Sequence, residues 1–189
     1  MGQLSLRELI LCALFVALVA VGALIRIPVG TDVFTLQFMF TLLAGLLLGP
    51  RLGATAVAVY ILLGLMGVPV FASGGGPGYI LQPTFGYLLG FVVQAWFCGW
   101  AARRGAVTFK RLLLINFGSM VIVYAFGLVW FYVISNYVID APVALYWVIL
   151  YCGILQIPPD ALLCVAAAAA AKRGLSAGIW LNPPRGTGR

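Results

Sequence analysis

Long charge-free stretches, separated by short breaks, dominate the pattern of hydrophobic and polar positions along the chain. A helix that spans a bilayer needs about 20 mostly apolar residues. The stretch 52–102 is too long for one crossing, and glycines and prolines between residues 67 and 83 divide it in two. The pattern therefore predicts five membrane-spanning helices before residue 140, near residues 9–25, 33–49, 53–66, 84–101 and 112–134.

The last quarter of the chain is predicted to hold one more crossing. Residues 141–159 are uncharged and rich in aromatic residues, and an alanine-rich run follows Pro158, Pro159 and Asp160. Proline suits the first turn of a helix, and a carboxylate suits its positive end. We therefore place the sixth helix at 158–172 and a short helix at 143–155 near the outer face. One long kinked helix is the alternative, and both descriptions give six crossings.

Composition supports the same class of protein. Hydrophobic residues make up 64% of the 189 residues, charged residues make up 8%, and the mean hydropathy is +1.14. Typical soluble domains are about 45–50% apolar and about 25% charged. This excludes a water-soluble globular protein and predicts an all-α polytopic membrane protein. We expect a single transmembrane domain over residues 1–173 and a flexible cytoplasmic tail over 174–189, which is rich in glycine, proline and arginine.

The distribution of charge predicts the orientation in the membrane. The chain has 11 basic and 4 acidic residues, a net charge of +7. Cytoplasmic loops of membrane proteins collect lysine and arginine. If the N-terminus is cytoplasmic, ten of the eleven basic residues face the cytoplasm, and only Arg26 lies outside, beside Asp32. Both termini are therefore predicted to be cytoplasmic. We expect no nucleic-acid partner, because no basic amphipathic helix or stacking platform accompanies the charge.

The residues for common enzyme chemistry are missing. The sequence has no histidine, which excludes Ser-His-Asp and Cys-His catalysis and histidine metal ligation. Its four cysteines form no C-x-x-C pair, and no phosphate-binding G-K-[ST] motif is present. We therefore expect no enzyme activity, no metal and no cofactor. A compact membrane protein that cannot itself hydrolyse ATP indicates a substrate-capture subunit.

Three features are candidates for a binding site. Asp160 is a lone acid beside an apolar stretch, which favours a functional role, although a helix-capping carboxylate is the alternative. The loop that follows residue 67 holds Phe71 and Tyr79, which are too apolar for a solvated connector, so we expect a lid over an outward-facing cavity. Gln37, close to Thr35 in an apolar run, needs a polar partner, either a ligand or another helix.

Other polar and small residues are predicted to bring helices together. Asn116, Gln94 and Tyr124 are interpreted as side chains that hydrogen-bond between helices. Ala13 and Ala17 form a small-x-x-x-small pair, which allows another helix to approach closely. The alanine run at 166–171 offers a second smooth helix face.

Several of these segments together resemble the BioY family, the biotin-specific S components of energy-coupling factor (ECF) transporters. The resemblance covers all six predicted helices and omits only the tail. Three positions depart from the usual family pattern: Phe85 replaces a glycine, Gln82 stands before Pro83 where glycine or serine is common, and Leu163 stands where a lysine is usual. The segments that carry the resemblance are GVPVFASGGGPGY at 67–79, PTFGYLLGF at 83–91, TLQ at 35–37, AGLLLGPRLG at 44–53 and IPPD at 157–160.

The resemblance implies a six-helix S-component fold in the cell membrane of a prokaryote. It implies a subunit that binds biotin from outside and docks through Ala13 and Ala17 onto a transmembrane T component, which couples to two ATP-binding-cassette ATPases. An S component for another small vitamin, or a ligand-free membrane assembly subunit, is the alternative.

Biotin chemistry suggests a role for each residue of the implied site. The carboxylate of Asp160 would accept the ureido N–H groups. The ureido carbonyl would need a donor, and the apolar thiophane ring would need aromatic neighbours. The candidates are Gln37, Thr35 or Gln82 for the carbonyl, Phe71, Tyr79 or Tyr87 for the ring, and Ser73, Thr84 or glycine-loop N–H groups such as that of Gly75 for the valerate carboxylate.

Overall fold

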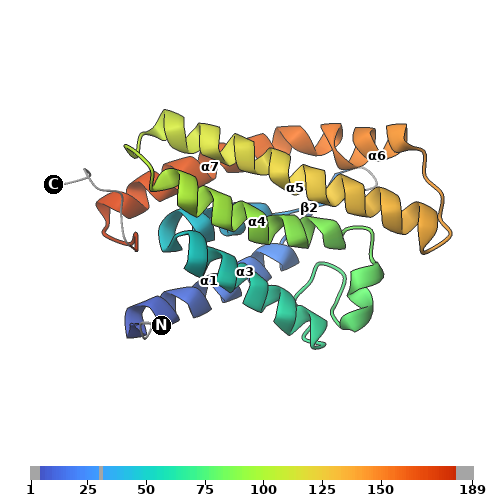
Figure 1. Ribbon diagram of the computed structural model, residues 1–189, viewed down its shortest axis with the longest axis horizontal. Helices are drawn as coiled ribbons and strands as arrows, with labels where there is room; N and C mark the ends of the chain where they lie inside the picture. Colours follow the sequence, from blue (N-terminus) through green and yellow to red (C-terminus); the bar gives the residue numbers. More distant parts are fainter. Residues whose placement is uncertain (1–4, 30–31, 182–189) are drawn as a thin grey trace.

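A bundle of long helices and one small β-hairpin make up the protein, for which a computed structural model describes residues 5–29 and 32–181 (Figure 1). The α-helices are α1 (Leu6–Leu24), α2 (Gln37–Leu43), α3 (Pro50–Leu65), α4 (Phe85–Ala102), α5 (Phe109–Tyr137), α6 (Leu145–Cys152) and α7 (Ile157–Ser176). The other elements are strands β1 (Arg26–Val29) and β2 (Asp32–Thr35), the π-helix η1 (Ala44–Leu48) and the 3₁₀ helices η2 (Pro77–Leu81) and η3 (Ile154–Gln156).

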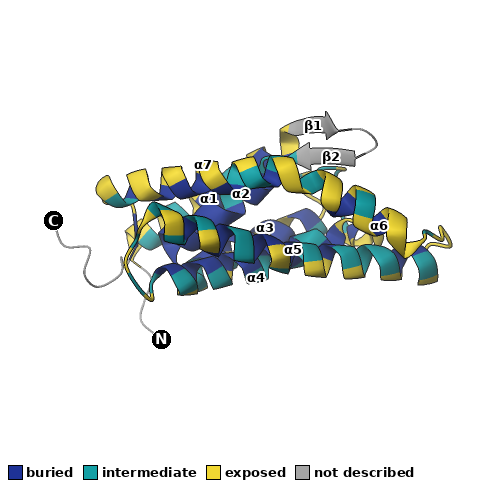
Figure 2. Ribbon diagram, turned by 90° about the horizontal axis from the view of Figure 1, so that it is seen from above, coloured by how far each residue is buried: buried dark blue, intermediate teal, exposed yellow. Residues whose placement is uncertain are grey.

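Four helical segments in the described part of the chain are long and apolar enough to cross a membrane: α1, α4, α5 and the α6–α7 segment Leu145–Ser176. The helices Gln37–Leu48 and Pro50–Leu65 are apolar but shorter. Exposed side chains on the outside of the bundle are largely apolar, among them Leu114, Val129 and Leu162 (Figure 2). Lipid rather than water suits such a surface.

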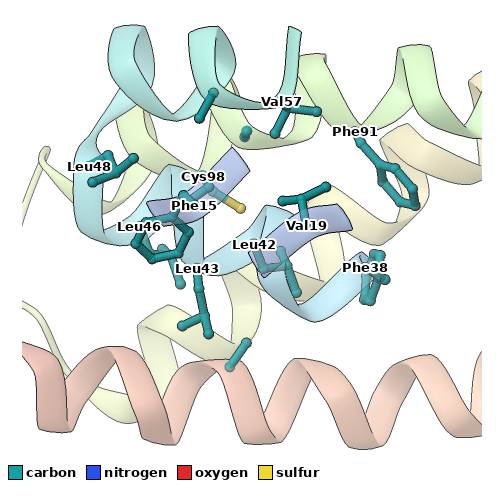
Figure 3. Close-up of a cluster of buried hydrophobic side chains, with 14 of the residues drawn as sticks. Phe15, Val19, Phe38, Leu42, Leu43, Leu46, Leu48, Val57, Phe91 and Cys98 are labelled. Carbon is teal, nitrogen blue, oxygen red and sulfur yellow. The ribbon is translucent and has the colours of Figure 1, made fainter. Parts of the chain in front are cut away.

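The helix α4 packs between α3 and α5, while α2 and η1 lie against α1, α4 and α7. Their contact forms a core of buried apolar side chains that includes Val19, Leu42 and Leu46 (Figure 3). The core also includes Phe38 and Phe91, whose ring centroids lie 6.3 Å apart. Both residues also line the cavity described below.

The segment expected to begin the second span is a strand rather than a helix. Residues 33–35 belong to β2, which pairs antiparallel with β1 in the register Arg26↔Thr35 to Val29↔Asp32. Val33, Phe34 and Thr35 are β-branched or aromatic and favour a strand. Pairing with β1 satisfies their backbone groups without a helix, so α2 begins only at Gln37.

The expected flexible tail from residue 174 is wrong over its first eight residues. The helix α7 continues to Ser176, and Trp180 and Leu181 are buried. The Trp180 indole N–H donates to the Ala171 carbonyl at 2.7 Å, and the Leu181 N–H donates to the Leu47 carbonyl at 2.9 Å. Burial of a large aromatic side chain outweighs the glycines around it. Residues 182–189 of that predicted tail lie outside the described part.

Arg103 joins this C-terminal segment to η1. Its guanidinium donates to the carbonyls of Leu46 at 3.2 Å, Gly99 at 3.0 Å and Leu181 at 2.6 Å. Burial lowers its pKa to about 10, so it stays charged at neutral pH. The η1 helix ends at Gly49, whose φ of 98° favours glycine. Arg103 therefore satisfies carbonyls that the end of η1 leaves without helical partners.

Replacing Arg103 with glutamine is expected to destabilise the protein by about 1–3 kcal/mol, because it leaves buried carbonyls without a donor. Thermal unfolding of the detergent-solubilised protein, followed by circular dichroism, measures the effect. The matched control is Arg104→Gln, since Arg104 is exposed and lies over the Trp100 ring. Equal unfolding temperatures for the two variants would contradict this role of Arg103.

Candidate functional site

A cavity of about 270 Å³ lies among α2, α4, α5, α7 and the loop that joins α3 to α4. It is found toward the end of the bundle where α6 and η2 lie, opposite the end where α1 begins and α7 ends (Figure 1). Phe38 and Phe91 form part of its wall, with Leu88 and Val123. A mostly apolar pocket with a few polar groups is typical of a small-molecule site.

The structure brings eight of the ten predicted binding residues to this cavity. They come from segments far apart in the sequence: the hairpin and α2, the α3–α4 loop, α4 and α7. The eight residues are Thr35, Gln37, Ser73, Tyr79, Gln82, Thr84, Tyr87 and Asp160.

Phe71, expected to contact a ligand, does not line the cavity. Its side chain is 1% exposed and lies against Gly64, in the space where any larger side chain would stand. It packs between two aromatic rings, with centroid distances of 5.5 Å to Tyr60 and 4.4 Å to Tyr79. Phe71 therefore supports Tyr79 from behind, because aromatic packing holds its ring inside the protein.

Gly75, the second exception, also lies away from the lining. A Cβ on this residue would clash with the Val68 carbonyl, so the glycine allows two backbone segments of the loop to meet. The neighbouring Gly76 N–H donates to the Gly64 carbonyl at 2.7 Å. The Tyr60 hydroxyl donates to the Val70 carbonyl at 3.1 Å. These contacts fold the loop back onto the end of α3.

Asp160 lies in the first turn of α7 and is 5% exposed. Its Oδ2 accepts a hydrogen bond from the Tyr124 hydroxyl of α5 at 2.6 Å. Within the part of the chain that the structure describes, Asp160 is the one charged side chain among the cavity-lining residues. A buried carboxylate needs hydrogen-bond donors, and Tyr124 supplies one of them.

Gln156 and Tyr124 are polar residues that line the cavity and that sequence reasoning missed as site residues. For Tyr124 the sequence indicated only a link between helices, and Tyr124 does join α5 to α7, but it also lines the cavity. The other two polar residues do connect helices as expected. The Asn116 amide donates to the Cys164 carbonyl at 2.8 Å, and the Gln94 Oε1 accepts from Thr41 at 2.9 Å. The rotation of α4 and α5 about their axes decides which of these side chains also reach the cavity, and the sequence does not specify that rotation.

Gln37 is the second buried polar group of the cavity. It is 4% exposed and lies near the Tyr60 hydroxyl, but its Nε2 makes no hydrogen bond of acceptable geometry within the described residues. An unsatisfied buried donor costs about 1–3 kcal/mol. A ligand oxygen placed in the cavity would remove that cost, so Gln37 is a candidate ligand donor.

Ala13 and Ala17 are exposed on the outer face of α1. The helix turns Phe15 and Val19 inward, where both are buried. The two alanines thus form a small-residue surface on the outside of the bundle, away from the cavity.

Comparison with known proteins gives consistent results. The model of the BioY family matches residues 1–178. A probable biotin transporter BioY of Lysinibacillus sphaericus is 41% identical over 172 residues, which cover 90% of this chain and 88% of the relative. The biotin transporter BioY of Thermotoga maritima is 42% identical over 136 residues, covering 71% and 78%.

Two solved structures share the fold. One is the crystal structure of the S-component for biotin from an ECF-type ABC transporter, with a TM-score of 0.67, 24% identity and coverage of 90% of this chain and 91% of that chain. The other is FolT bound with folic acid, with a TM-score of 0.66, 15% identity and coverage of 89% and 95%. At these identities the likeness concerns the fold alone, because chains with this fold bind different ligands.

Proposed function

Because the chain belongs to the BioY family, we propose that it is a substrate-capture subunit that binds biotin and delivers it through an ATP-driven ECF transporter. The observation that carries this proposal is a cavity lined both by one buried carboxylate, Asp160, and by a buried amide, Gln37, whose Nε2 makes no hydrogen bond within the described residues. A cyclic urea presents N–H donors next to a carbonyl acceptor, so this pair of protein groups complements it.

The ureido ring is placed at the inner end of the cavity. The Tyr124 hydroxyl occupies one lone pair of Asp160 Oδ2, and Oδ1 remains to accept from a ureido N–H. Gln37 Nε2 donates to the ureido carbonyl, and Thr35 and Gln82 are the other candidate donors. The hydrogen bond from a ureido N–H to the charged Asp160 carboxylate contributes about 1.5–3 kcal/mol.

The apolar part of biotin is placed against aromatic rings. Tyr79 and Tyr87 line the cavity, and Tyr87 is held by its hydroxyl, which donates to the Cys152 carbonyl at 2.7 Å. The valerate chain then extends toward Ser73 and Thr84 in the α3–α4 loop, both of which are exposed lining residues. No cofactor is required for this binding.

An S component for another small vitamin is the second candidate, because the fold is shared with a folic-acid-binding protein. Against it stands the agreement among the relatives' names, which are biotin transporters in each case compared above. In a ligand-free assembly subunit, no ligand would offset the cost of burying Gln37 Nε2 and the Asp160 carboxylate.

The proposed arrangement is a multi-pass protein of a prokaryotic cell membrane with six crossings and both termini cytoplasmic. The helix ends opposite the cavity hold every basic residue whose side chain is described, and this favours that end as cytoplasmic (Figure 1). The side chains of Arg26 and Asp32 lie outside the described part. The basic residues at the helix ends opposite the cavity are Arg7, Arg51, Arg103, Arg104, Lys110, Arg111, Lys172 and Arg173.

The partners in this proposal are a transmembrane T component and two ATP-binding-cassette ATPases. The chain has no G-K-[ST] phosphate-binding motif, so ATP hydrolysis must come from other subunits. The T component would approach the α1 face that holds Ala13 and Ala17, because small residues allow close helix packing in lipid.

Labelling of a cysteine at position 73 tests ligand binding and orientation together. Ser73→Cys should react with a membrane-impermeant maleimide from outside the cell, and biotin should slow the reaction about tenfold or more by occupying the cavity and ordering the loop. The matched control is Met66→Cys, because Met66 is 80% exposed at the same end but does not line the cavity. Labelling only from the cytoplasmic side would overturn the orientation. An unchanged rate with biotin would contradict the binding site.

A further inference from the structure

The charge of the groups that line the cavity affects how well it can bind a ligand with a charged tail. Among the lining residues whose side chains are described, the polar groups other than Asp160 are neutral hydroxyls, amides and a thiol. The basic residues with described side chains stand at the opposite helix ends. The described cavity thus holds one negative charge and no positive charge to offset it.

Free biotin is itself an anion at neutral pH, because an alkyl carboxyl group has a pKa of about 4–5. Bound with its ureido ring at Asp160, it would place a second carboxylate in the same cavity. Two like charges in a partly desolvated site repel each other, and a neutral group has no such cost. At a separation of about 10 Å and an effective dielectric constant of about 20, the repulsion corresponds to about tenfold in affinity.

The groups near the mouth suit a neutral tail. Ser73, Gln82 and Thr84 are exposed lining residues of the α3–α4 loop, and their hydroxyl and amide groups both donate and accept hydrogen bonds. An amide also has one donor and one acceptor side, whereas a carboxylate only accepts. Because these residues are exposed, a substituent on the tail can extend from the mouth.

We propose, building on biotin capture as the function, that the cavity binds biotin whose carboxyl group is neutralised as an amide or ester more tightly than it binds the free acid. The subunit then accepts tail-conjugated biotin as a ligand class. Specificity lies in the bicyclic head, and Asp160 disfavours an anionic tail.

Competition binding to the purified, detergent-solubilised protein tests the proposal. Radiolabelled biotin is displaced at pH 7.5 by unlabelled biotin, biotinamide and biotin methyl ester. The expected result is that the amide and the ester bind about tenfold more tightly than the acid. Equal or tighter binding of the acid would overturn the proposal. Absence of binding by all three compounds would instead overturn biotin capture itself.

The variant Asp160→Asn tests the cause of the preference. Overall affinity falls for every ligand, but the ratio of amide to acid affinity should shrink toward one, because the repelling charge is gone. An undiminished ratio would show that Asp160 is not the cause and would overturn the mechanism. If the wild type prefers the acid and Arg26→Gln loses that preference, the proposal is overturned too. That result would mean that Arg26 of the hairpin supplies a cation for the carboxylate.

Discussion

Replacing Ala13 and Ala17 together with tryptophan is expected to abolish ATP-dependent biotin uptake while leaving biotin binding unchanged. The two alanines are one turn apart and exposed on α1, whereas Phe15 between them is buried. Helices in lipid associate through close packing, and two indole rings would hold the T component away. Uptake of radiolabelled biotin by cells, co-purification of the T component and biotin binding by the isolated subunit are measured in parallel.

Tryptophans on another exposed helix face provide the control for this double variant. Val121 and Val129 are 64% and 65% exposed on α5, so replacing both tests whether bulk on any outer face blocks transport. Normal uptake by the Ala13/Ala17 variant would rule out α1 as the docking face. The exposed alanines of α7, Ala166 and Ala170, would then become the next candidate surface.

Asp160→Asn is expected to weaken biotin binding by about tenfold to 150-fold without preventing folding. The substitution removes a charged acceptor and presents an amide N–H₂ group that faces the ureido donors, a change of about 1.5–3 kcal/mol. Equilibrium binding to the purified variant and its thermal unfolding measure the two effects separately.

Asp140→Asn is the matched control for this substitution. Asp140 is exposed, and its φ of 50° is a conformation that asparagine tolerates well. We expect it to bind biotin like the wild type. Wild-type affinity in Asp160→Asn would reduce Asp160 to a helix-capping carboxylate and remove the central contact of the proposed site.

Helix positions were largely predictable, and the differences arise where backbone pairing or long-range packing competes with hydropathy. Charge-free runs placed α4 and α5 close to where they lie. The same criterion extended a span over residues 33–35, because strand residues are as apolar as helix residues. The glycine, proline and arginine content of residues 174–189 likewise assigned Trp180 and Leu181 to a flexible tail, because their contacts with Ala171 and Leu47 form only in the folded bundle.

The polar lining of the cavity was predictable as a set of residue types, but not as a geometry. A lone acid at a helix start and a glycine-rich aromatic loop are local features, so Asp160 and Tyr79 were identified from the chain itself. The rotation of each helix about its axis is a tertiary property. It turned Tyr124 toward Asp160 and turned Phe71 away from the cavity.

By itself the sequence determined that this protein is surrounded by lipid, that it is a helical membrane protein, and which catalytic motifs it lacks. Too few charged residues exist to cover a soluble core, basic residues mark one set of helix ends, and no histidine or phosphate-binding loop is present. Only the tertiary structure decided which side chains meet. Apolar helices in lipid carry little sequence signal for rotation, because both the lipid and the protein interior accept leucine or valine. That packing forms the Asp160–Tyr124 bond and, within the described residues, leaves Gln37 Nε2 without a hydrogen bond and Asp160 as the one charged group that lines the cavity.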